Sequence, residues 1–235
     1  MTTLPPDRPS ILVVGASRGL GHAMATEFVE RGWDVVGTVR DVGRHTLLHD
    51  LAAAHPAHVC IETLDIDDTI ELDALHERLR GRSFDMLFVN AGTTSHEWTP
   101  IGQVPTDAFV SVMVTNALSP VRVIETLSDV VAPSGLLGAM SSGQGSITNN
   151  TTAMREVYRG SKAALNMFMR SVALRQADTG RFVVLAPGWV QTDLGGDQAT
   201  YTVEETAPLL VDVLLAKRER QGLEFLDRFG RTVPW

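Results

Sequence analysis

The chain has 235 residues and a net charge of −8 at pH 7, with 44% hydrophobic and 20% charged residues. This composition is typical of a soluble globular protein, and the acidic balance excludes nucleic acid as the expected partner, because proteins that bind a phosphate backbone are usually basic. Cys60 is the only cysteine, so no intrachain disulfide can form and a reducing compartment is expected. The N-terminus has no apolar signal segment, and no uninterrupted apolar run reaches the roughly 18–20 residues that span a bilayer. We therefore expect a cytoplasmic protein without a membrane partner.

Short apolar runs alternate with longer amphipathic segments along the chain. In chain order the pattern predicts a strand at 11–15, a helix at 20–32, strands at 34–39 and 58–65, a helix at 69–81, a strand at 85–92, a helix at about 106–131, a strand at 135–142, a helix at 158–176, a strand at 181–188, a helix near 203–218 and a strand near 223–230.

This alternation predicts the α/β class: one Rossmann-type, doubly wound parallel sheet with helices on both faces, forming a single domain over residues 1–235. No internal repeat and no linker divides the sequence. The least regular segments, 93–104, 143–157 and 189–202, each follow the end of a predicted strand. Ligands bind at that edge of such sheets, so these segments are expected to form the walls of a pocket.

A glycine-rich turn, "VGASRGLG", lies between the first predicted strand and the first predicted helix, with Gly15, Gly19 and Gly21. Glycine lets the backbone turn tightly and approach a pyrophosphate, and the helix N-terminus then offers free N–H groups to the phosphates. The alternative is a tight strand-to-helix turn without a ligand. The position after the first strand of an alternating chain favours a nucleotide.

Three more motifs follow in order: "VNAG" at 89–92, "YRGSK" at 158–162 and "APGWVQTD" at 186–193. Together with the glycine turn they resemble the short-chain dehydrogenase/reductase family over nearly the whole chain, and among its members the small carbonyl reductases and C-factor-type proteins. One departure is Val14, where the family usually has a Thr whose hydroxyl helps to brace the turn. The resemblance implies that a nicotinamide dinucleotide contacts Gly15, Ser17, Arg18, Gly19, Leu20, Gly21, Asn90, Ala91, Gly92, Tyr158, Lys162, Pro187, Gly188, Val190 and Thr192.

The end of the second predicted strand bears on the choice of nucleotide. An NAD enzyme typically has a carboxylate there for the ribose 2′-hydroxyl, and by the resemblance that position is Val39. Arg40 follows, and Arg18 lies in the glycine turn, so two guanidiniums would favour a 2′-phosphate and predict NADPH/NADP as the cofactor. Two alternatives stay open: Asp41 holds the ribose of NAD, or Arg40 is a solvated surface charge.

Asp65 and Ile66 end the third predicted strand. By the resemblance Asp65 faces the adenine and Ile66 packs beside the ring. The alternative for Asp65 is a cap of the following helix, for which Asp67 and Asp68 also qualify.

Tyr158 and Lys162 lie one turn apart on the same face of a predicted helix. A phenol has a reference pKa near 10, which is too high for a base at neutral pH, and a neighbouring ammonium favours the phenolate and lowers that pKa. Tyr158 is then the general acid when a carbonyl is reduced and the base in the reverse direction. On this hypothesis Lys162 lowers the Tyr158 pKa and holds the nicotinamide ribose; the alternative is a chance pair on a helix surface.

Ser142 ends the fifth predicted strand and, by the resemblance, holds the substrate carbonyl and stabilises its developing negative charge. Ser141 and Ser146 are the competing candidates. Ser142 is preferred, because consecutive residues of a strand point to opposite faces.

Asn116 lies inside the long predicted helix, and by the resemblance its backbone carbonyl holds a water next to Lys162. Residue 120, which would donate to this carbonyl in a regular helix, is Pro120 and has no N–H. The Asn116 carbonyl is therefore free, and the helix is expected to kink there. A water between Asn116 and Lys162 would complete a proton path to solvent. The alternative is an ordinary proline kink with Asn116 on the surface.

Other features of the sequence give weaker evidence about function. The histidines at 45, 49, 55 and 58 lack the companions of a metal site and are interpreted as surface residues. Trp98 and Trp189 either line a substrate slot or cap the core. The segments around 109–127 and 160–174 are apolar on more than one face, which predicts packing against a second subunit in a homodimer or homotetramer.

The sequence thus predicts an NADPH-dependent reductase of a ketone or aldehyde carbonyl, with a small-molecule carbonyl or alcohol as substrate and no metal. Two alternatives remain: a nucleotide-sensing or signalling protein with little turnover, and an NAD-dependent alcohol dehydrogenase. The identity of the substrate is not readable from the loops.

Overall fold

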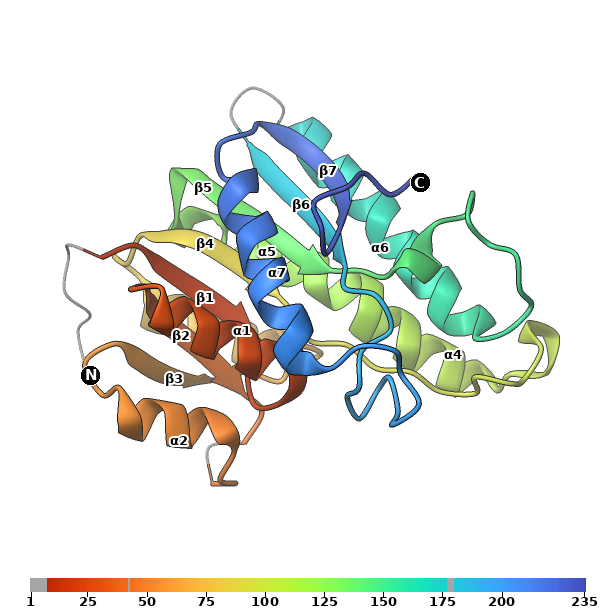
Figure 1. Ribbon diagram of the computed structural model, residues 1–235, viewed down its shortest axis with the longest axis horizontal. Helices are drawn as coiled ribbons and strands as arrows, with labels where there is room; N and C mark the ends of the chain where they lie inside the picture. Colours follow the sequence, from red (N-terminus) through yellow and green to blue (C-terminus); the bar gives the residue numbers. More distant parts are fainter. Residues whose placement is uncertain (1–7, 42, 177–179) are drawn as a thin grey trace.

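Seven parallel strands form one sheet in the order β3-β2-β1-β4-β5-β6-β7 (Figure 1). The computed structural model describes residues 8–41, 43–176 and 180–235. The chain leaves β1 toward β2 and β3, then returns and places β4 on the other side of β1, where Ile11 pairs with Met86. This doubly wound order confirms the predicted fold class. The strands are β1 Ser10–Val14, β2 Asp34–Val39, β3 Val59–Thr63, β4 Phe84–Val89, β5 Val131–Met140, β6 Arg181–Ala186 and β7 Gly222–Asp227.

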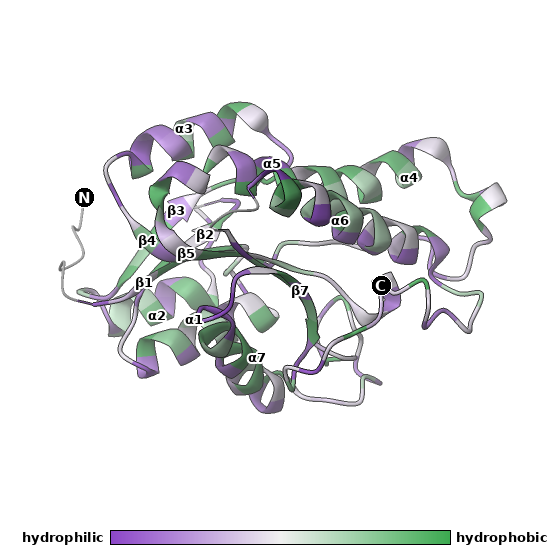
Figure 2. Cartoon of the chain, turned by 90° about the horizontal axis from the view of Figure 1, so that it is seen from above, coloured by the Kyte–Doolittle hydropathy of each residue, from purple (hydrophilic) through white to green (hydrophobic). Residues whose placement is uncertain are grey.

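Helices cover both faces of the sheet (Figure 2). One face carries α1 Gly19–Glu30, α2 Leu47–Ala54 and α7 Val203–Lys217, and the other carries α3 Thr69–Leu79, α4 Thr106–Met113, α5 Ser119–Thr126 and α6 Glu156–Arg175. The central strands β1, β2, β4 and β6 are buried on both sides, whereas the edge strands β3 and β7 are partly exposed. A separate apolar cluster fills the space between the sheet and each helical layer. Burial on both faces explains why the strands appear in the sequence as continuous Val- and Leu-rich runs.

The short helix α2 was not predicted. It begins at a cap in which the Thr46 backbone N–H donates to His49 Nδ1 over 3.1 Å. Leu48 and Leu51 are buried on its inner side. A helix of eight residues shows too few turns for its periodicity to stand out from the surrounding loop.

The predicted helix over 106–131 is interrupted, as expected, but in a different form. After α4 the chain makes a π-helical turn at Val114–Leu118, in which the Ser119 N–H donates to the Val114 carbonyl, and α5 then ends at Thr126. Pro120 lies in the first turn of α5, directly after the π-helical turn. By length and composition alone, the run from 106 to 126 would pass for a membrane-crossing helix. In the fold its inner side packs against the sheet and α6.

Several predicted strands end earlier than expected. The observed ends are Val14, Val89, Met140 and Ala186, where 15, 92, 142 and 188 were predicted. The motif residues that follow therefore lie in loops at the carboxyl edge of the sheet, and α6 begins at Glu156, which places Tyr158 in its first turn.

Candidate active site

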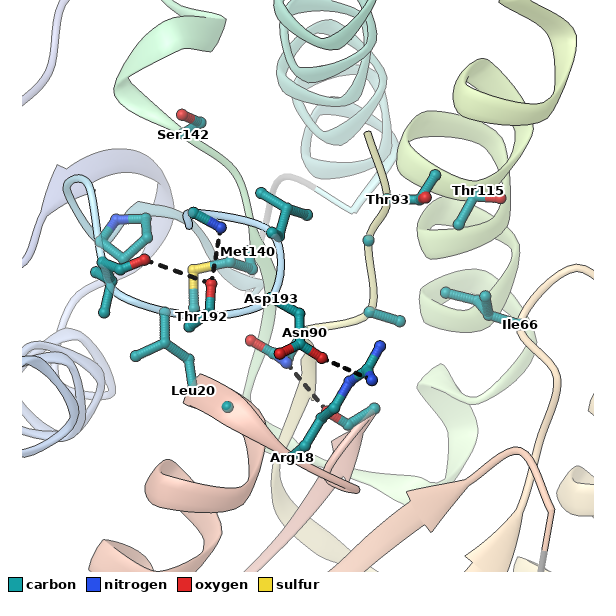
Figure 3. Close-up of a pocket in the computed structure, with 18 of the residues that line it drawn as sticks. Arg18, Leu20, Ile66, Asn90, Thr93, Thr115, Met140, Ser142, Thr192 and Asp193 are labelled. Carbon is teal, nitrogen blue, oxygen red and sulfur yellow. Dashed lines mark hydrogen bonds and ion pairs between the residues drawn. The ribbon is translucent and has the colours of Figure 1, made fainter. Parts of the chain in front are cut away.

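A cavity of about 960 Å³ opens at the carboxyl edge of the sheet. It is bounded by the β1–α1 turn and by the loops that follow β2, β3, β4, β5 and β6. The predicted nucleotide contacts line it together with Ser142, except Gly21, which packs behind the turn against the Gly15 carbonyl. Figure 3 shows this arrangement, with Arg18 and Leu20 at one end and Ser142 at the other. The cavity thus joins the two predicted halves of the site in one space large enough for a dinucleotide and a small substrate.

The glycine turn has a backbone that side chains would obstruct. Gly15 has φ +85°, and a Cβ on Gly21 would lie 2.0 Å from the Gly15 carbonyl oxygen. Asn90 Nδ2 donates to that same oxygen over 3.0 Å and ties the turn to the end of β4 (Figure 3). Close approach of backbone to backbone, at the N-terminus of α1, is the geometry that a bound pyrophosphate requires. The residues present therefore fit a dinucleotide.

The hydroxyl that the turn lacks at Val14 is supplied from β2. Thr38 Oγ1 accepts the Gly15 N–H over 2.9 Å, and the Thr38 carbonyl accepts the Ala16 N–H over 3.0 Å. Thr38 is 1% exposed. The expected loss of a brace at Val14 is thus compensated by a residue that sequence reasoning missed.

Arg18 and Arg40, the two residues predicted to bind the ribose 2′-phosphate, lie in different environments. Arg18 Nη1 lies 2.7 Å from Asp193 Oδ2, and both side chains are exposed (Figure 3). Arg40 lines the cavity, whereas Asp41 accepts the Gly43 N–H in the adjacent turn over 2.8 Å. The Arg18–Asp193 ion pair, which joins the glycine turn to the loop after β6, was not predicted.

Asp65 and Ile66 also line the cavity. Asp65 does not cap α3: Asp68 does, accepting the Ile70 and Glu71 N–H groups. Asp65 Oδ1 instead accepts the Asp67 N–H over 3.0 Å. The helix-cap alternative for Asp65 is therefore wrong.

Tyr158 is buried, with 7% of its surface exposed. Burial is the largest influence on its pKa and raises it above the ordinary value, while the Arg155 charge and a hydrogen bond with Ser142 act to lower it and the Glu97 charge acts to raise it. The expectation that Lys162 lowers the Tyr158 pKa is not met by the chain's own groups. Arg155 lies nearer the ring than Lys162 does, with its guanidinium carbon 4.5 Å from the ring centre.

Lys162 is 3% exposed and its Nζ donates to the Met140 carbonyl over 2.8 Å. Burial lowers the Lys162 pKa to about 8. Nζ lies 5.8 Å from the Tyr158 ring centre. A Cβ on Gly92 would lie 3.5 Å from this nitrogen and 3.4 Å from Asn116 Oδ1, so the motif after β4 sits between Lys162 and Asn116.

The three serine candidates have different partners. Ser142 lines the cavity and hydrogen-bonds with Tyr158, and its Oγ accepts the Gln144 N–H over 3.1 Å. Ser141 Oγ donates to Asn166 Oδ1, and Ser146 Oγ accepts the Asn149 N–H. The structure thus brings Ser142, and not its two competitors, to the phenol.

Asn116 is fully buried in the π-helical turn. Its Oδ1 accepts the Thr93 N–H, and its Nδ2 donates to the Thr93 carbonyl and to Ser161 Oγ. The alternative that placed Asn116 on the surface is wrong. The side chain fastens the loop after β4 to α6, and the water held by its backbone carbonyl stays a prediction.

The loop after β6 covers the glycine turn. Pro187, Gly188, Val190 and Thr192 all line the cavity, and a Cβ on Gly19 would lie 3.5 Å from Thr192 Cγ2 (Figure 3).

The two tryptophans in the pocket loops behave differently. Trp189 also lines the cavity, with its indole nitrogen donating to the Gly195 carbonyl. Trp98 is 77% exposed and caps no core.

The histidines form no metal centre. The His45 and His49 rings stack 5.4 Å apart, and His45 lies 3.2 Å from an Asp50 oxygen. Among residues 8–41, 43–176 and 180–235, no group of three or more His, Cys, Asp or Glu side chains is arranged to hold a metal ion.

A cavity of this size at the carboxyl edge of a doubly wound sheet, lined by a buried Tyr and a buried Lys, is the arrangement expected of a nicotinamide-dependent oxidoreductase. Comparison with known proteins identifies the family: the sequence model of the short chain dehydrogenase family matches residues 9–201, and the chain belongs to this family. It is an NAD(P)-dependent oxidoreductase of the classical short-chain type.

Relatives lie in the carbonyl reductase and C-signal branches. A Burkholderia multivorans protein described as a short-chain dehydrogenase/reductase, crystallised with NADP, is 61% identical, with a TM-score of 0.94 over 97% of this chain and 100% of that one. A carbonyl reductase from Pseudomonas aeruginosa is 29% identical, with a TM-score of 0.90 over the same shares. The C-signal protein of Myxococcus xanthus is 34% identical over 64% of this chain and 92% of its own length.

Proposed function

We propose that the protein reduces a ketone or aldehyde carbonyl of a small molecule to an alcohol, using NADPH. The observation that carries the proposal is the convergence of Ser142, Tyr158 and Lys162 at the inner end of the cavity. NADP(H) is supported by the NADP-bound Burkholderia multivorans relative and by Arg18 and Arg40, whose guanidiniums suit a 2′-phosphate. The nucleotide would lie along the glycine turn with its adenine toward Asp65 and Ile66.

When bound, the cofactor supplies a hydride to the carbonyl carbon. Ser142 positions the carbonyl oxygen, and Tyr158 gives that oxygen its phenolic proton as the C–O double bond becomes single. A phenol whose pKa is raised by burial is fully protonated at neutral pH, which suits a general acid. In the reverse direction Tyr158 must first lose its proton, so oxidation needs a cation near the phenolate.

Lys162 would hold the nicotinamide ribose and, with a water on the Asn116 carbonyl, return a proton to Tyr158 from solvent. The burial that lowers the Lys162 pKa to about 8 makes proton exchange accessible near neutral pH. Asn116 also fixes the loop carrying Gly92 and Thr93 against α6.

The test is the loss of reduced-nicotinamide absorbance with a panel of ketones, aldehydes and quinones, with NADPH and NADH in parallel. We expect turnover with NADPH, and a loss of about 10²-fold or more in Tyr158→Phe with unchanged NADPH binding. Turnover with NADH alone would refute the cofactor choice and favour the alcohol dehydrogenase alternative. Tight NADPH binding without turnover on any carbonyl would favour the sensing alternative.

We also propose a homodimer or homotetramer that covers the outer faces of α4 and α6. Phe109 and Val110 on α4, and Met167 and Phe168 on α6, are exposed large apolar side chains on two helices that pack together. Sedimentation analysis of Phe168→Glu against the wild type tests this, since a charge on a buried interface would dissociate the assembly. A monomeric wild type would refute it.

A further inference from the structure

We propose that the ion pair between Glu97 and Arg155 is an electrostatic positioning device for Tyr158, in which the Arg155 guanidinium stabilises the phenolate and Glu97 limits that effect. The inference rests on the proposed role of Tyr158 as general acid and base. It assigns a function to two residues from two loops that no motif identifies.

The pair joins two walls of the cavity. Arg155 Nη2 lies 2.8 Å from Glu97 Oε1, and the Arg155 backbone N–H donates to the Glu97 carbonyl over 2.7 Å. Thr94 Oγ1 donates to the same Glu97 carboxylate oxygen over 3.1 Å. The loop after β4 is therefore fastened to the residue that precedes α6 by both backbone and side chains.

Arg155 has a backbone conformation that requires support. Its φ of +58° lies in the left-handed region, which is energetically unfavourable for a non-glycine residue. The two contacts with Glu97 offset this cost. With the backbone fixed in this way, the guanidinium carbon lies 4.5 Å from the centre of the Tyr158 ring, and the side chain is 14% exposed.

Arg155 is better suited than Lys162 to hold a phenolate at alkaline pH. A guanidinium stays protonated at any pH that the protein survives, whereas burial lowers the Lys162 pKa to about 8. Lys162 Nζ is also farther away, 5.8 Å from the ring centre, and donates to the Met140 carbonyl. Arg155 lowers the Tyr158 pKa and Glu97 raises it, and a hydrogen bond with the neutral Ser142 side chain also lowers it.

This geometry predicts opposite effects for two substitutions in one ion pair. Arg155→Met removes the cation and keeps the stem, so the Tyr158 pKa rises. Glu97→Gln removes the anion and leaves the cation over the ring, so the Tyr158 pKa falls. Arg155→Lys retains a cation and should lie between the wild type and Arg155→Met.

The direct measurement is titration of tyrosinate absorbance, which needs neither substrate nor turnover. The chain has two tyrosines, so Tyr201→Phe leaves Tyr158 as the only phenol, and the Tyr158→Phe, Tyr201→Phe double variant is the blank. Each Arg155 and Glu97 variant is made in the Tyr201→Phe background, and its circular dichroism spectrum and melting curve verify that it folds.

The second measurement is the pH dependence of alcohol oxidation, with the cofactor in excess. A shift of one pH unit corresponds to about tenfold in rate below the Tyr158 pKa. We expect Arg155→Met to lose about tenfold there and Glu97→Gln to gain. Shifts in the same direction for both variants, or no shift in folded Arg155→Met, would overturn the proposal. If the wild type reduces no carbonyl and oxidises no alcohol but the titrations shift in opposite directions, the electrostatic role of the ion pair is supported and the proposed catalytic function fails.

Discussion

Replacing Lys162 with Met should make the protein's stability less dependent on pH. Burial lowers the Lys162 pKa from 10.5 to about 8 in the folded protein. In the unfolded chain Lys binds its proton more tightly, so folding opposes protonation of this side chain. The resulting cost is fully present below about pH 8, is relieved as pH rises from about 8 to 10.5, and is absent above that range.

The size of the effect follows from the shift. About 2.5 pKa units at about 1.4 kcal/mol each correspond to roughly 3 kcal/mol at neutral pH. Removing the ammonium also leaves the Met140 carbonyl without its donor, at a cost of about 1–3 kcal/mol. The two contributions oppose each other at neutral pH, so the absolute stability of Lys162→Met is less informative than its change with pH.

The assay is urea unfolding of the wild type and Lys162→Met at several pH values, without nucleotide. The difference in unfolding free energy should change by about 2–3 kcal/mol between about pH 7 and pH 10, with the wild type gaining relative to the variant. Other titrating groups are shared by both proteins and cancel. Parallel stability curves over this range would refute the reasoning, because they would mean that Lys162 keeps an ordinary pKa when buried.

Two further predictions concern the glycine turn. Gly21→Ala should weaken NADPH binding at least about tenfold, since its Cβ would lie 2.0 Å from the Gly15 carbonyl oxygen; Gly160→Ala, where a Cβ meets nothing within 4 Å, is the control, and equal binding by both variants in fluorescence titrations would contradict this. Thr38→Val should cost about 1–3 kcal/mol of unfolding free energy, because the Gly15 N–H loses its acceptor, whereas Thr38→Ser should retain most of the stability. Equal urea midpoints for the Val and Ser variants would show that the hydroxyl does not brace the turn.

The sheet could be predicted from the sequence because its central strands are buried on both faces and are followed by recognisable loops. The residues from Ile11 to Val14 are all apolar, and a glycine follows them directly. Three of the four motifs directly follow strand ends and the fourth lies at the start of α6, which is why the sequence was enough to predict that Tyr158, Lys162 and most of the predicted nucleotide contacts line one cavity. The π-helical turn was predicted only as an irregularity, since Pro120 shows where a regular helix fails but not which hydrogen bonds replace it.

The contacts that were missed depend on tertiary structure. Thr38 lies on β2 and braces a turn 23 residues earlier, and nothing in its own segment indicates that role. Glu97 and Arg155 meet only because two loops cross at the same edge of the sheet. The raised pKa of Tyr158 and the lowered pKa of Lys162 follow from burial, which a Tyr-x-x-x-Lys motif does not encode.

Because β4 pairs with β1, the residues that line the cavity come from segments spread over most of the chain, from Val14 to Gly195. No short segment of the sequence contains the whole nucleotide site, so the unfolded chain offers nothing comparable to bind. Occupancy of the cavity is then coupled to the folding equilibrium by mass action: a nucleotide at a hundred times its dissociation constant adds about 2.7 kcal/mol of stability. A rise in melting temperature therefore reports ligand binding, so nucleotides and candidate substrates can be ranked by this rise before any reaction is known.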